Sequence, residues 1–88
     1  MKGGGKMTLI EYLRKEKGLS QAQLSRELLN ISPSAIAQIE NEYRKSWPKL
    51  REQLSHFFDV EEGVLFNVDG WPKKINIDLP KIPLKSKH

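Results

Sequence analysis

Helix-capping signals near the start of the chain constrain its fold more than any other sequence feature. Thr8 followed by Glu11 has the spacing of a capping box, in which a hydroxyl accepts a hydrogen bond from an amide of the first turn. Ser20 followed by Gln23 has the same spacing, and the serine–proline pair at 32–33 supplies a cap followed by a first-turn proline. The first half of the chain is therefore predicted to contain several short helices.

The expected ends of these helices follow from the residues between them. Gly18 and Asn30 favour the left-handed conformation that stops a helix. Pro48 favours the start of a later helix, whose apolar residues recur at i, i+4, i+7 and i+8, and a shorter turn follows near Val64. The expected helices are 9–17, 21–29, 33–41, 48–58 and 61–66. The predicted fold class is all-α, a compact five-helix domain with an extended C-terminal tail.

Composition excludes several classes of protein. The 88 residues are enough for one domain. Cysteine is absent and two histidines are too few and too far apart for a zinc site, so we expect neither a metal nor another cofactor. No apolar run is long enough to cross a membrane, and the first residues do not form a signal peptide. We therefore expect a cytoplasmic protein that does not associate with a membrane.

The net positive charge of the chain lies at its two ends. Of the formal net charge of +4, residues 1–7 carry +2 and residues 67–88 carry +3, which leaves −1 on residues 8–66. We expect 1–7 to be a flexible basic arm because it contains three consecutive glycines. Residues 8–66 form the predicted domain, and 67–88 form an extended basic tail. Any binding of nucleic acid by the domain must depend on local arrangement and not on bulk charge.

Two segments resemble the lambda-repressor-like family of helix-turn-helix proteins, also called the Cro or XRE type. They are Leu-Ser-Gln-Ala-Gln-Leu-Ser at 19–25 and Ser-Pro-Ser-Ala-Ile-Ala-Gln-Ile-Glu-Asn at 32–41. The likeness extends from about Thr8 to Phe66. It implies a regulator of transcription that binds specific sequences of double-stranded DNA, acts as a repressor by occupying its operator, and works as a two-fold dimer.

The resemblance also implies roles for individual residues. Base edges in the major groove would be contacted by Pro33, Ser34, Ala37 and Gln38. The phosphate backbone would be contacted by Gln21, Asn41, Arg44 and Lys45, and Gln21 would also support the recognition helix. Helix geometry agrees, because inward positions for Ile36 and Ile39 turn Ser34, Ala37 and Gln38 outward.

The chain departs from the family pattern at three places. The turn containing Leu29 and Asn30 is one residue longer than usual, Glu42 occupies a position where glycine is common, and Ser46 replaces a common proline. A carboxylate at position 42 disfavours DNA binding unless it points away. Glu40 is expected to be structural and to pair with Arg14 or Arg26.

The sequence is also compatible with other functions. The main alternative is a protein-interaction module, such as an antitoxin or adaptor, on the same helical fold. Large apolar anchors on the outward face of the third helix would favour it, and Ser34, Ala37 and Gln38 are small or polar. The cations at Lys49 and Arg51 could extend the phosphate-contacting cluster or be solvated. An enzyme is not expected, since no nucleophile has a plausible base nearby.

The tail contains a pattern typical of a strand. Three apolar side chains alternate with polar ones, namely Ile75, Ile77 and Leu79. A lone strand with an apolar face needs a partner surface. We favour dimerisation through the same strand of a second protomer, because a symmetric DNA reader requires a dimer. The alternatives are packing on the chain's own domain near Phe57, Phe66 and Trp71, a disordered basic tail, or binding of another protein partner.

Overall fold

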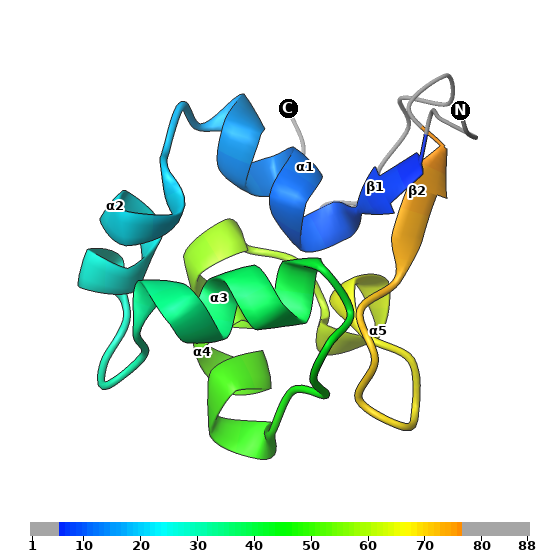
Figure 1. Cartoon of the computed structure of the whole chain (residues 1–88). Helices are drawn as coiled ribbons and strands as arrows, with labels where there is room; N and C mark the ends of the chain where they lie inside the picture. The colour runs from blue at the N-terminus through cyan, green and yellow to red at the C-terminus, as the bar shows by residue number, and fades with distance from the viewer. Residues whose placement is uncertain (1–5, 77–88) are drawn as a thin grey trace.

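Five helices and a short two-stranded sheet make up the computed structural model, which describes residues 6–76 (Figure 1). The all-α class and the five-helix architecture predicted from the sequence are confirmed. The elements, in chain order, are β1 (Lys6–Thr8), α1 (Leu9–Glu16), α2 (Gln21–Glu27), α3 (Pro33–Glu40), α4 (Pro48–Phe58), α5 (Glu62–Leu65) and β2 (Lys74–Asn76).

The hydroxyl caps of α1, α2 and α3 form as predicted, but only half of the predicted Thr8–Glu11 capping box is present, because the Glu11 carboxylate pairs with Lys15. The Thr8 hydroxyl accepts from the amide of Glu11 at 3.2 Å, and Ser32 accepts from an amide of α3 at 3.0 Å. Ser20 and Gln23 form a complete capping box with distances of 3.0 and 2.8 Å. These bonds satisfy amides that have no partner within their own helix. Local hydrogen bonding therefore sets where α1, α2 and α3 begin.

Several helices end slightly earlier than the sequence predicts. The largest difference is in α2, which ends at Glu27 and not at residue 29, because Leu28 has an extended backbone and a buried side chain. Gly18 has the positive φ of 72° that its stop position after α1 requires. Asn30 also has a positive φ, of 60°, but it lies in the turn beyond the end of α2 at Glu27 and does not stop that helix. The helix bounds thus depend on how the chain turns into the core as well as on local propensity.

One hydrophobic core lies between the helices. Side chains of α1, α3 and α4 meet in it, and Ile10, Ile39 and Leu50 are each only 1% exposed. The buried apolar residues are Leu9, Ile10, Leu13, Leu24, Leu28, Ile31, Ala35, Ile36, Ile39, Leu50, Leu54, Phe58, Val60, Leu65 and Phe66. Because Ile36 and Ile39 of α3 point into this core, the opposite face of α3 is turned to solvent.

Strands β1 and β2 pair antiparallel, with Met7 opposite Ile75 (Figure 1). This corrects one expectation. Lys6 and Met7 belong to a strand and not to a flexible arm. Ile75 pairs with Met7 of its own chain and is partly buried against the core, so this residue has the packing within the chain that was an alternative for the tail. Dimerisation through the tail stays a prediction. The other two predicted dimer residues, Ile77 and Leu79, lie outside the described residues.

A buried ion pair joins α1 to α3. The Arg14 guanidinium donates to both carboxylate oxygens of Glu40, at 2.7 and 2.9 Å, and the two side chains are 8% and 2% exposed. Of the two partners considered for Glu40 from the sequence, the structure selects Arg14. The hydrogen bond to Glu40 raises the pKa of Arg14 above its ordinary value, although burial acts in the opposite direction.

Removing one member of this pair should destabilise the protein severely. Arg14→Met leaves the buried Glu40 carboxylate without its cation, so the free energy of unfolding should fall by about 3–5 kcal/mol. The double variant Arg14→Met/Glu40→Leu should lose less than the sum of the two single variants, because it leaves no unpaired charge. Urea denaturation of the three variants measures these differences.

The exposed pair between Lys15 and Glu11, 3.1 Å apart, provides the control. Lys15→Gln should lower the free energy of unfolding by less than about 0.5 kcal/mol. Strict additivity of the two single substitutions at 14 and 40 would contradict the assignment of Arg14 and Glu40 as one coupled unit.

Candidate nucleic-acid interface

The outward face of α3 carries the residues predicted to contact bases. Pro33, Ser34 and Gln38 are exposed, and Ala37 is half-buried. Their neighbours Ile36 and Ile39 are buried. The face is small and polar, so a helix that presents it fits the width of a DNA major groove.

Gln21, the first residue of α2, is tied to the end of α3. Its side-chain amide donates to Glu40 Oε1 at 2.9 Å, so Glu40 accepts from both Arg14 and Gln21. Arg14 also donates to the main-chain oxygen of Leu19, just before α2, at 2.8 Å. The contact by which Gln21 was predicted to support the recognition helix is therefore present, and it fixes how α3 sits relative to α1 and α2.

Arg44 lies against the face of α3. Its guanidinium donates to Gln38 Oε1 at 3.3 Å and lies 4.7 Å from the centre of the Trp47 ring. Lys45 makes a comparable contact with Trp71, at 6.0 Å. Both cations are exposed and are placed by aromatic rings, as in cation–π interactions. This orienting contact with the two tryptophans was not predicted from the sequence.

Glu42 has a left-handed backbone conformation, with φ of 62°. Glycine adopts this conformation without steric cost, which explains why glycine suits the position. The Glu42 carboxylate forms an ion pair with Lys74 of β2 at 3.1 Å. Lys74 was not identified from the sequence, because no local spacing connects the two residues. The carboxylate next to α3 is therefore paired with a cation from the tail.

Ser46 connects the loop after α3 to the turn before β2. It is buried, and its hydroxyl and amide donate to the main-chain oxygen of Gly70 at 2.7 and 2.9 Å. Arg51 donates to the main-chain oxygen of Ser46 at 3.2 Å and lies 3.9 Å from Glu62. Arg51 is therefore partly buried and bound within the chain, unlike a solvated cation.

Gly70 has little room for a side chain. Its φ is 94°, and a Cβ there would lie 3.1 Å from Arg51 Nη1 and 3.3 Å from the main-chain oxygen of Ser46. The chain after α5 thus passes directly against the loop that follows α3. Gly70, the fourth residue of the predicted tail, therefore packs against the predicted domain.

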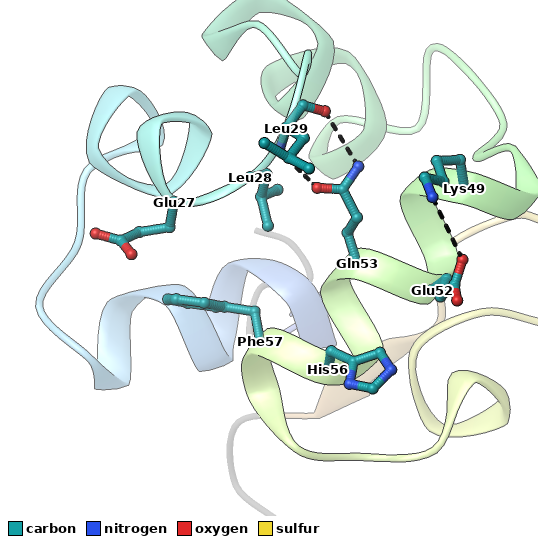
Figure 2. Close-up of a pocket in the computed structure, with 8 residues that line it drawn as sticks. All are labelled: Glu27, Leu28, Leu29, Lys49, Glu52, Gln53, His56 and Phe57. Atoms are coloured by element: carbon teal, nitrogen blue, oxygen red, sulfur yellow. Dashed lines mark hydrogen bonds and ion pairs between the residues drawn. The ribbon is translucent and has the colours of Figure 1, made fainter.

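Gln53 of α4 binds the turn between α2 and α3 (Figure 2). Its amide oxygen accepts from the Leu29 amide at 2.6 Å, and its amide nitrogen donates to the Leu29 carbonyl at 3.1 Å. Leu28 and Ile31 on either side are buried, whereas Leu29 is 71% exposed. The extra residue of this turn therefore bulges outward, and α3 keeps its contact with the core.

Comparison with known proteins gives a family match. A family model described as "Helix-turn-helix" matches residues 10–65, which is more than half of the chain. Neither the curated proteins nor the solved structures that we searched gave a significant match. Among residues 6–76, no helix has the length and apolar character needed to cross a bilayer. The matched segment includes α2 and α3 but ends before Gly70 and Lys74.

Loss of the Gln53 contacts should loosen the turn. Gln53→Ala removes two hydrogen bonds to Leu29, so the free energy of unfolding should fall by about 1–2 kcal/mol. Exchange of the Leu29 amide hydrogen should become about tenfold faster. Glu52→Ala is the control, because it changes helix propensity on the same helix by a similar amount and removes no hydrogen bond to Leu29. It should change neither the free energy of unfolding nor the exchange rate appreciably. Unchanged exchange at Leu29 would show that Gln53 does not hold the turn.

Proposed function

Because the chain belongs to the lambda-repressor-like helix-turn-helix family, we propose that it binds specific operator sequences in double-stranded DNA as a two-fold dimer and represses transcription by occupying them. Proteins of this family are DNA-binding transcription regulators, and in this general sense the function follows from membership. The observation that carries the finer proposal is the exposed polar face of α3, with Gln38 beside the cation Arg44. We place this activity in the cytoplasm, with the DNA.

In this proposal α3 enters the major groove. The amide of Gln38 has the donor and acceptor needed to pair bidentately with adenine, and the Ala37 methyl group can contact a thymine methyl. Pro33 and Ser34 at the start of α3 would approach the neighbouring bases, since recognition helices contact bases through their N-terminal residues. These contacts would supply the sequence preference.

Phosphate contacts would position α3 in the groove. Asn41, Arg44 and Lys45 follow α3 and are exposed, which is the arrangement that backbone contacts require. Gln21 still has an N–H beyond the one that it donates to Glu40, and that N–H can reach a phosphate. Because Arg44 donates a hydrogen bond to Gln38, a phosphate contact by Arg44 would also affect the orientation of the base-reading Gln38 side chain.

The proposed dimer would place two α3 helices one turn of DNA apart. Because β2 pairs with β1 along one edge, the predicted dimer contact through Ile75, Ile77 and Leu79 would use the other edge of the strand. The rival function, a protein-interaction module, would need large apolar anchors on α3. The predicted contact residues that α3 exposes are instead Pro33, Ser34 and Gln38, and these small or polar residues favour DNA binding.

Base reading by Gln38 can be tested after selection of bound sequences from random duplexes, which should enrich an inverted repeat. Gln38→Ala should weaken binding to the selected site by about 1–3 kcal/mol and relax the preference at one or two base pairs. Affinity for an unrelated duplex should change little. Equal weakening on all duplexes would remove Gln38 from the base contacts, and a selection without an inverted repeat would contradict the two-fold dimer.

Phosphate contact by Arg44 and Lys45 predicts a different outcome. Arg44→Gln and Lys45→Gln should each weaken binding to all duplexes by a similar factor and reduce the slope of log affinity against log salt by about one. Lys17→Gln is the control, because the Lys17 ammonium lies over the Phe57 ring of α4 and not beside α3. Salt slopes for Arg44→Gln and Lys45→Gln that match the parent's would place both residues outside the interface.

A further inference from the structure

Glu42 places a negative charge where the proposed interface needs none. It follows Asn41, the cap residue at the end of α3, and it precedes the two cations Arg44 and Lys45. Its side chain is 39% exposed, so its field is not confined to the protein interior. A DNA phosphate within the screening length of about 8–10 Å would be repelled by this carboxylate. The ion pair between Glu42 and Lys74 therefore bears directly on DNA binding.

The backbone around Lys74 is fixed by three parts of the fold. Lys74 is paired with Thr8 in the sheet, and the main-chain oxygen of Lys73 accepts from the Leu9 amide at 2.8 Å. The Lys73 amide in turn donates to the main-chain oxygen of Leu65 at 2.8 Å. Strand β2 is thus held against the start of α1 and the end of α5, so that Lys74 is directed to Glu42 by the fold.

The ion pair between Glu42 and Lys74 contributes little to the stability of the fold. Both side chains are substantially exposed, at 49% and 39%, and exposed ion pairs contribute little to the free energy of unfolding. The same pair has a larger consequence next to DNA, because it neutralises a charge at the edge of the interface. Glycine, the common residue at this position, would carry no charge to neutralise.

We propose that Lys74 is a positioning residue for DNA binding, which neutralises Glu42 and holds its carboxylate away from the phosphate backbone. This inference rests on the proposed DNA-binding function. It extends the interface beyond the family-matched segment, because Lys74 lies in the strand that pairs with the N-terminal segment. DNA affinity therefore depends on the closure of the two-stranded sheet.

The test compares Lys74→Gln with Lys73→Gln in the full chain. Both substitutions remove one positive charge from adjacent exposed lysines, and only Lys74 is paired with Glu42. At low salt, Lys74→Gln should weaken duplex binding about fivefold more than Lys73→Gln, as expected for one exposed charge repelled at about 4 Å in water. The excess should shrink as added salt screens the carboxylate. Lys74→Arg should bind like the parent.

The same two substitutions are then made with Glu42→Gln, which removes the charge to be neutralised. In that background Lys74→Gln and Lys73→Gln should have equal effects. An excess effect that persists would mean that Lys74 contacts DNA itself, and equal effects in the parent would mean that it acts only through overall charge. Either result overturns the inference while leaving the proposed function intact.

Thermal unfolding of each variant checks that the comparison concerns folded protein, and the midpoints should agree within a few degrees because the pair is exposed. A parent protein that binds no duplex would overturn the proposed function itself, and the inference with it. Duplex binding by the parent protein is measured first, so a failure of the proposed function is distinguished from a failure of the inference about Lys74.

Discussion

The buried ion pair between Arg14 and Glu40 restricts how α3, the helix of the candidate interface, is presented. Two charges taken out of water are costly unless their geometry is good and their other hydrogen-bonding groups are satisfied. Here Glu40 accepts from Arg14 and Gln21, while Arg14 also binds the main-chain oxygen of Leu19. One network therefore reaches α1, the start of α2 and the end of α3. The apolar contacts of Ile36 and Ile39 hold α3 to the core, and the ion pair restricts its orientation there.

Local chemistry explains why the helices could be predicted from the sequence. A serine or threonine cap, a first-turn proline and a left-handed stop act within a few residues, so Ser20, Ser32 and Gly18 mark helix boundaries without knowledge of the fold. The outward face of α3 could be predicted in the same way, because it lies opposite the apolar Ile39, which points into the core. The partner of Glu40 did not, because Arg14 and Arg26 are both reachable in sequence terms, and only the packing of α1 against α3 selects Arg14.

Contacts between distant segments could not be predicted in this way. The segment that becomes β1 has three residues, which is too short to show an alternating pattern, so its pairing with the strand of the tail was not predicted. The ion pair of Glu42 with Lys74 and the hydrogen bonds of Ser46 to Gly70 join segments whose distance along the chain carries no signal. Each of them becomes visible only when the chain after α5 is placed beside the loop that follows α3.

The three departures from the family pattern acquire a common explanation from these contacts. The longer turn at Leu29 is bound by Gln53, the charge of Glu42 is neutralised by Lys74, and the loop at Ser46 is fixed by Gly70. Two of these three partners lie beyond the segment that matches the family. A chain can therefore keep the family's recognition helix while changing the loops around it, provided that other segments supply the lost constraints. The turn before β2 and β2 itself are accordingly integral to the geometry of the candidate interface.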